Sequence, residues 1–148
     1  AGAAGISLFN RFFQPDIDLE TLTVVDRVQL SSSADTLLAM RWIAILRGST
    51  GISLAATGGV HTAEDALKML LAGADVVHIA SALLKQGPQI LGEILADITR
   101  WLEEREYVSV AQLKGSLSQQ NSPSPSAFAR AAYLHVLDSF TPPSGVRY

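Results

Sequence analysis

Residues 52–81 decide the fold, and their sequence is ISLAATGGVHTAEDALKMLLAGADVVHIAS. Two apolar runs in this stretch, at 52–57 and 75–80, have the length and composition of buried strands. The segment 62–73 between them has apolar residues at helical spacing, a capping box in which Asp substitutes for Glu, and a glycine at its end. The sequence therefore predicts a strand–helix–strand unit, which is typical of parallel sheets.

The residues before this unit predict a further strand and helix. Residues 6–9 form a short apolar run that ends at Asn10, as expected for a buried strand with polar groups at its carboxyl end. The long connection 11–33 contains alternating apolar residues, and we expect an extra hairpin or a lid there. A helix is predicted over 33–47 with Ser33 as its cap. Its predicted apolar face consists of Leu38, Trp42, Ile45 and Leu46.

The residues after this unit predict mainly helices. A short helix is expected at 81–85, and Pro88 opens a long amphipathic helix that ends near Glu106. Residues 122–125 predict a linker before a last helix at about 127–140, and the end of the chain predicts a tail. The apolar stripe expected on the last helix consists of Tyr133, Val136, Leu137 and Phe140.

Three βα units in succession predict an α/β fold with a parallel sheet and right-handed crossovers. A closed (β/α)8 barrel, or TIM barrel, has eight such units in about 250 residues, whereas this chain has 148. The chain also lacks an initiator methionine. We therefore expect a partial (β/α)8 TIM barrel that either belongs to a longer polypeptide or forms an open fragment.

The composition excludes several classes of protein. Hydrophobic residues make up 48% of the chain and charged residues 17%, which predicts a packed core. The net charge of −3 gives no basic field for phosphate backbones, so we expect no nucleic-acid partner. The absence of cysteine excludes disulfides and thiolate metal sites. The same absence of cysteine fits a cytoplasmic protein. No apolar run reaches the roughly 20 residues that span a bilayer, so we predict no membrane partner.

Small residues follow two consecutive predicted strands, Gly58-Gly59 after one and Ala80-Ser81 after the next. In (β/α)8 enzymes the loops after the last two strands, with a short extra helix, commonly form a phosphate site. Glycines let the backbone approach a ligand, and exposed N–H groups bind its oxygens. The alternative is that the glycines only make a tight turn and that the alanine and serine only allow close helix packing.

Residues 55–66 and 72–83 resemble the flavin-phosphate segment of dihydroorotate dehydrogenases. Further matches to the family's carboxyl end are Gly87, Pro88, Tyr107, Ser109, Leu113 and Gly115. The resemblance implies that residues 1–117 are the last three βα units of an FMN-binding barrel. Residues 118–148 would then be a carboxy-terminal helical extension made of a linker, a helix and a tail.

The resemblance also implies an activity, the FMN-dependent oxidation of a dihydropyrimidine in pyrimidine biosynthesis. The FMN phosphate would be held by the backbone amides of Gly58, Gly59, Ala80 and Ser81, where the family commonly has glycine and threonine at the last two positions. The family's catalytic base and a lysine near the flavin lie in an earlier part of the barrel. We therefore expect no catalytic residue in this segment and no turnover by the chain alone.

Asn10 is similar in position to a family asparagine that hydrogen-bonds the pyrimidine-like substrate. The next residue is Arg11, where the family usually has serine or threonine, so the true substrate stays open. The alternative for Asn10 is a turn residue or a helix cap.

The three histidines are too widely spaced for a metal site, and we predict none. We expect His61 to be a solvated loop residue and His135 to lie on the surface of the last helix. His78 lies within a predicted strand, either beside a flavin or satisfied by its neighbours.

Two other classes of function stay open. One is a non-flavin barrel enzyme that binds a phosphorylated substrate. The other is a non-catalytic half-barrel module. Because open sheet edges favour pairing, we expect a homo-oligomer or association with the remainder of a barrel.

Overall fold

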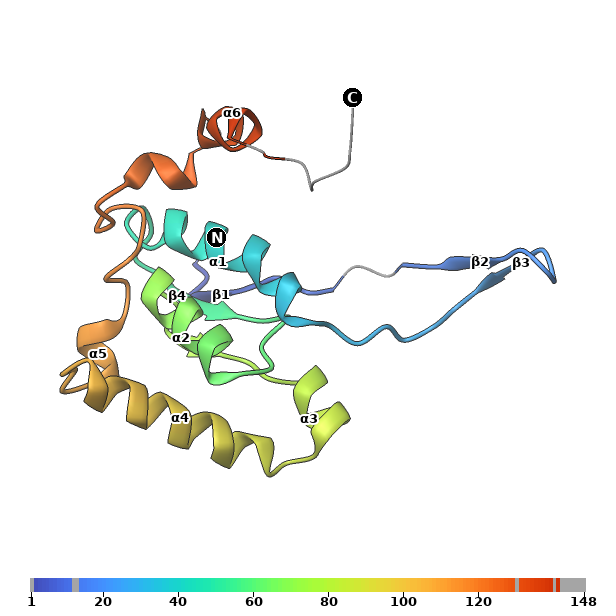
Figure 1. Ribbon diagram of the computed structural model, residues 1–148, viewed down its shortest axis with the longest axis horizontal. Coiled ribbons are helices and arrows are strands. Elements are labelled where there is room, and N and C mark those ends of the chain that lie inside the picture. Colours follow the sequence, from blue (N-terminus) through green and yellow to red (C-terminus); the bar gives the residue numbers. More distant parts are fainter. Residues whose placement is uncertain (1, 12–13, 130, 140, 142–148) are drawn as a thin grey trace.

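Three short parallel strands form the centre of the structure (Figure 1). The structure, a computed structural model, describes residues 2–11, 14–129, 131–139 and 141. The strands are β1 (Gly5–Leu8), β4 (Ser53–Ala56) and β5 (Val76–Val77), and they are paired in this order. The predicted α/β fold with a parallel sheet is confirmed. The last strand is shorter than predicted, because the chain leaves the sheet after the His78 amide donates to the carbonyl of Ala56.

Helices alternate with these strands, as predicted. The helical segments are η1 (Ser33–Asp35), α1 (Thr36–Leu46), α2 (Ala63–Ala72), α3 (Ser81–Gln86), α4 (Ile90–Glu104), α5 (Val110–Leu113), η2 (Pro125–Phe128) and α6 (Ala131–Asp138). Helix α1 packs beside α2, and α2 packs beside α4. The predicted helix at 33–47 is therefore a short 3-10 turn followed by an α-helix.

The connection between β1 and α1 contains an antiparallel hairpin of β2 (Asp16–Asp18) and β3 (Thr23–Val25). The hairpin option is confirmed. The hairpin projects away from the body of the molecule (Figure 1). Ile17 and Val24 are paired across it, and both are mostly exposed.

The prediction for the buried face of α1 was wrong in part. Leu38 is 56% exposed and Trp42 is 40% exposed. The buried face is made instead by Thr36 and three apolar residues: Ala39, Ile43 and Ala44. Helix α1 is apolar on nearly all sides, so periodicity could not select the face. The alanines allow a closer approach to the sheet and to α2 than leucine and tryptophan would.

Two clusters of buried side chains make the core. In the first, Ile43, Leu54 and Met69 are fully buried between the sheet and helices α1 and α2. In the second, Leu113 packs on α2 beside Trp101 and Tyr107, whose rings stack 5.8 Å apart. The second cluster joins α4 and α5 to the rest of the fold.

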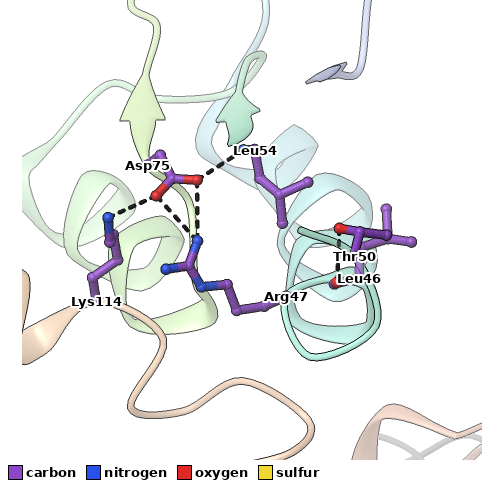
Figure 2. Close-up of polar contacts among 6 residues, drawn as sticks. All are labelled: Leu46, Arg47, Thr50, Leu54, Asp75 and Lys114. Carbon is purple, nitrogen blue, oxygen red and sulfur yellow. Dashed lines mark hydrogen bonds and ion pairs between the residues drawn. The ribbon is translucent and has the colours of Figure 1, made fainter. Parts of the chain in front are cut away.

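Asp75 connects three separate segments at the amino-terminal edge of the sheet (Figure 2). Its carboxylate accepts hydrogen bonds from Arg47 Nη1 at 3.0 Å, from Lys114 Nζ at 2.6 Å and from the backbone amide of Leu54 at 2.9 Å. Burial alone would raise the pKa of Asp75, but the hydrogen bonds from Lys114, Leu54 and Arg47 outweigh it and lower the pKa from 3.8 to about 2.

The chain after α5 is hydrogen-bonded to α1 and α2. The backbone amides of Gly115 and Leu117 donate to the carbonyls of Leu70 and Leu71, and that of Gln119 donates to Ala44. The division at residues 117 and 118 stays a prediction.

The predicted last helix is split into η2 and α6. The expected stripe is not buried, because Tyr133, Val136 and Leu137 are all more than half exposed, while Phe140 lies outside the described residues. Within the described residues, none of the helices combines the length and the apolar character needed to cross a membrane.

We predict that Asp75→Asn lowers the free energy of unfolding by about 2 kcal/mol at pH 7, because the charge-assisted bonds to Arg47 and Lys114 are lost. Since the pKa of Asp75 is lowered by folding, its stabilising effect is present above about pH 4 and is lost as the pH falls toward 2. Urea unfolding at several pH values measures both effects. Glu64→Gln, which breaks an exposed pair with Lys68, is the control and should change the unfolding free energy far less than Asp75→Asn, because water screens the pair.

Candidate functional site

The carboxyl ends of β1, β4 and β5 meet at one edge of the sheet and line a cavity of about 390 Å³. Residues from all three strand ends contribute to its wall, among them Asn10, Thr57, Gly58, Ala80 and Ser81. A second hollow of about 480 Å³ lies between the end of α1 and the carboxy-terminal segment, and it has no charged side chain in its wall. The first cavity is therefore the better candidate for chemistry.

The two glycines after β4 serve different purposes. Both have positive φ, +91° at Gly58 and +82° at Gly59. A Cβ at Gly59 would lie 2.5 Å from the backbone nitrogen of Thr36, so this glycine is required by close packing on α1. A Cβ at Gly58 would meet only the carbonyl oxygen of Phe9, at 3.8 Å. The positive φ of both glycines agrees with the tight-turn alternative, but Gly58 also leaves open space beside the cavity.

Three of the four predicted phosphate-binding amides have no acceptor among the residues that the structure describes. The N–H groups of Gly58, Ala80 and Ser81 donate to nothing within the residues that the structure describes, and all three residues line the cavity. Backbone N–H groups need partners, and a ligand with several oxygens could supply them. The Gly59 amide differs, because it donates to the hydroxyl of Ser31 at 3.3 Å.

Ser31 is a site residue that the sequence did not identify. Its side chain also lies 3.2 Å from His61 Nε2, its backbone amide donates to Ser81 Oγ at 3.1 Å, and its carbonyl accepts from Lys85 Nζ at 2.8 Å. The interpretation of His61 as a solvated loop residue was therefore wrong, since the ring is half-buried and hydrogen-bonded. No local signal could have found Ser31, because its partners lie 28 to 54 residues away.

Asp65 holds the loop after β4 in place. The predicted capping box with Thr62 is confirmed, and the same carboxylate accepts from Ser33 Oγ at 2.7 Å and from the His61 amide at 3.0 Å. Burial alone would raise the pKa of Asp65, but the hydrogen bonds from Ser33, His61 and Thr62 outweigh it and lower the pKa. Asp65 therefore stays ionised and links the start of α2 to the 3-10 turn before α1.

Asn10 is exposed at the mouth of the cavity, next to Arg11. Its side-chain oxygen accepts from the Arg11 amide at 2.9 Å, which agrees with the turn-residue alternative. The side-chain NH₂ group is not used by that bond and can donate to a ligand. Both interpretations of Asn10 are thus compatible.

The remaining histidines add no metal site. His78 is exposed, and the side chain of His135 lies outside the described residues. No group of three or more histidine, aspartate or glutamate side chains suited to a metal ion occurs in the part of the chain that the structure describes.

Comparison with known proteins assigns the family. Residues 3–102 match the dihydroorotate dehydrogenase family model. The chain belongs to the dihydroorotate dehydrogenase family. The matched residues include the three strands of the parallel sheet and all the residues that line the cavity. Lys114, which binds Asp75, lies beyond the matched residues.

Similar dihydroorotate dehydrogenases are longer than this chain. The catalytic subunit of dihydroorotate dehydrogenase B (NAD(+)) from Shouchella clausii is 32% identical over 118 residues, which cover 78% of this chain and 38% of that protein. Dihydroorotate dehydrogenase A (fumarate) from Lactococcus lactis is 36% identical over 66 residues, which cover 45% of this chain and 21% of that protein. The chain thus spans less than half the length of these relatives.

The fold is similar to that of solved dihydroorotate dehydrogenases. The crystal structure of the Eimeria tenella enzyme in complex with ferulenol superimposes with a TM-score of 0.62 at 21% sequence identity, over 77% of this chain and 31% of that chain. A ligand-free structure of the enzyme from the same organism gives a TM-score of 0.54, over 57% of this chain and 24% of that chain.

We predict that alanine lowers the unfolding free energy by different amounts at Gly58 and at Gly59. Gly58→Ala should cost about 1–2 kcal/mol of unfolding free energy, because only the positive φ is unfavourable. Gly59→Ala should cost more than about 3 kcal/mol, because the new methyl group also clashes with Thr36. Urea unfolding of the two variants measures the difference, and equal losses would contradict the assigned roles.

Proposed function

We propose that this chain supplies the FMN-phosphate site of an FMN-dependent oxidoreductase of the dihydroorotate dehydrogenase type. The observation that carries the proposal is the set of three backbone amides, at Gly58, Ala80 and Ser81, that line one cavity and have no acceptor among the described residues. Gly59 supplies the turn that presents Gly58. Residues 1–117 would be the last three units of a (β/α)8 barrel, and 118–148 its carboxy-terminal extension.

Backbone amides suit a phosphate because each N–H donates to one oxygen without the cost of ordering a long side chain. Lys85 places a cation near the proposed phosphate site, since its Nζ donates a hydrogen bond to the carbonyl of Ser31. Ala80 has a methyl group where the family commonly has glycine, so the approach to its amide is narrower than in the usual family pattern.

FMN, when bound, would accept hydride from the substrate. The chain's own residues would do other work: Gly58, Ala80 and Ser81 would hold the phosphate, and the NH₂ group of Asn10 would donate to a carbonyl oxygen of a pyrimidine-like substrate. The base and the lysine beside the flavin would come from another part of the full-length enzyme. We therefore expect no dihydroorotate turnover by this chain alone.

The rest of the barrel is the partner that this proposal requires. The outer strands of the sheet carry exposed apolar side chains, Ile6 on β1 and Val76 on β5. Burial of such side chains by neighbouring strands stabilises a barrel. A second copy of the chain is the alternative partner for the same edges.

The first test compares FMN with riboflavin, which lacks the phosphate. We expect the purified chain to retain FMN and to bind riboflavin at least about tenfold more weakly, because only FMN engages the three amides. Visible absorption and quenching of flavin fluorescence measure both affinities. Binding of inorganic phosphate without either flavin would favour a non-flavin barrel enzyme, and binding of none would contradict a phosphate site in this chain.

A matched pair of variants tests the position of the phosphate. Ala80→Glu places a carboxylate in the cavity wall, whereas Ala80→Gln places a neutral side chain of the same shape there. We expect the glutamate variant to bind FMN at least about tenfold more weakly than the glutamine variant, because of charge repulsion. Riboflavin should bind the two variants equally. The same difference with riboflavin would show that the charge disturbs the flavin ring rather than the phosphate.

A further inference from the structure

Ser31 has all of its polar groups engaged and is only 6% exposed. Its amide donates to Ser81 Oγ, its carbonyl accepts from Lys85 Nζ, and its hydroxyl oxygen accepts from the Gly59 amide and lies beside His61 Nε2. A buried residue with four polar partners on two other segments is a fixed connection, because releasing it would leave several buried groups without hydrogen bonds.

The partners of Ser31 lie on the two segments that carry the phosphate-binding amides, the loop after β4 and the loop after β5 with the helix α3 that it enters. Gly59 and His61 belong to the loop after β4, while Ser81 and Lys85 belong to α3, which follows β5. In the described part of the chain, the hydrogen bonds that join these two loops through a third residue all pass through Ser31. Beyond the ends of the paired strands β4 and β5, the spacing between the Gly58 amide and the amides of Ala80 and Ser81 therefore depends on Ser31.

We propose that Ser31 is the positioning residue of the phosphate site. The Ser31 hydroxyl accepts the hydrogen bond of the Gly59 amide, which leaves the amides of Gly58, Ala80 and Ser81 to bind a phosphate. Ser31 holds these three donors at the spacing that one phosphate requires. This proposal rests on the proposed function, because it takes the FMN phosphate as the ligand. Donors fixed before binding lose little entropy when the ligand arrives.

A competing account would make the Ser31 hydroxyl a placeholder that leaves when phosphate arrives. The burial of Ser31 and the contact of its hydroxyl with His61 Nε2 argue against release, because a hydroxyl that left the Gly59 amide would also lose this second partner inside the fold. The two accounts predict opposite effects of removing the hydroxyl. A positioning residue strengthens phosphate binding, whereas a placeholder weakens it.

The test compares Ser31→Ala with Ser32→Ala. Ser32 is the neighbouring serine, and its hydroxyl contacts only Asp35 among the described residues. We expect Ser31→Ala to lower the ratio of FMN affinity to riboflavin affinity about tenfold, since a misplaced donor set affects only the phosphate. Ser32→Ala should leave the ratio unchanged. An unchanged or raised ratio in Ser31→Ala overturns the proposal, the raised ratio in favour of the placeholder.

Amide hydrogen exchange in the full chain without ligand gives a second measurement. Ser31→Ala removes the hydroxyl that accepts from the Gly59 amide, so exchange in residues 58–62 should become at least about tenfold faster, whereas Ser32→Ala should leave it unchanged. If the unaltered chain binds no FMN, the proposed function fails, while the exchange data still decide whether Ser31 holds the two loops. Unchanged exchange in residues 58–62 overturns the positioning role.

Lys85→Met covers the case in which Ser31→Ala does not fold. Lys85 is exposed and hydrogen-bonds the carbonyl of Ser31, so its loss should leave the fold intact. We expect exchange to become severalfold faster at residues 58–62, although Lys85 makes no hydrogen bond or ion pair to that loop among the described residues. An effect confined to α3 would overturn the proposal, because the two loops would then be independent.

Discussion

The carboxylate of Asp75 holds together the amino-terminal edge of the sheet. It binds the end of α1 through Arg47, the start of β4 through the Leu54 amide, and the segment after α5 through Lys114 (Figure 2). A carboxylate with three donors is stabilised in its charged form, so this edge is fixed without a metal or a ligand. In barrels of parallel strands, this is the edge that contributes stability rather than chemistry.

The opposite edge has unsatisfied groups. At the carboxyl ends of the strands, the amides of Gly58, Ala80 and Ser81 have no acceptor within the described chain, and Gly58 adopts a φ of +91°. Such features cost stability, and they are tolerated where the surrounding structure is fixed by other contacts. Asp65 and Ser31 supply those contacts here, since each ties the loop after β4 to the segment that precedes α1. Rigid support below and beside the loops therefore leaves the amides available to a ligand.

Local signals in the sequence predicted the elements well, and distant contacts explain what they missed. The capping box of Thr62 and Asp65, the strand before Gly58 and the hairpin each depend on residues close together in the chain. The buried face of α1 was missed because leucine, tryptophan and alanine surround the helix, and only packing distinguishes them. Ser31 was missed because one serine among three carries no signal, and its partners come from the loops after β4 and β5.

The contacts of Asp75 also bear on where the folded unit ends. The match to the family model stops at residue 102, yet Lys114 beyond it donates to the carboxylate that fixes the sheet. The amides of Gly115, Leu117 and Gln119 then bond to carbonyls at the ends of α2 and α1. Leu113 and Ser118 are fully buried in the same region. The segment 113–119 thus contributes to the core beside the matched strands, and a chain cut after residue 102 would lose Leu113 and Tyr107 from the cluster around Leu67 and Leu70.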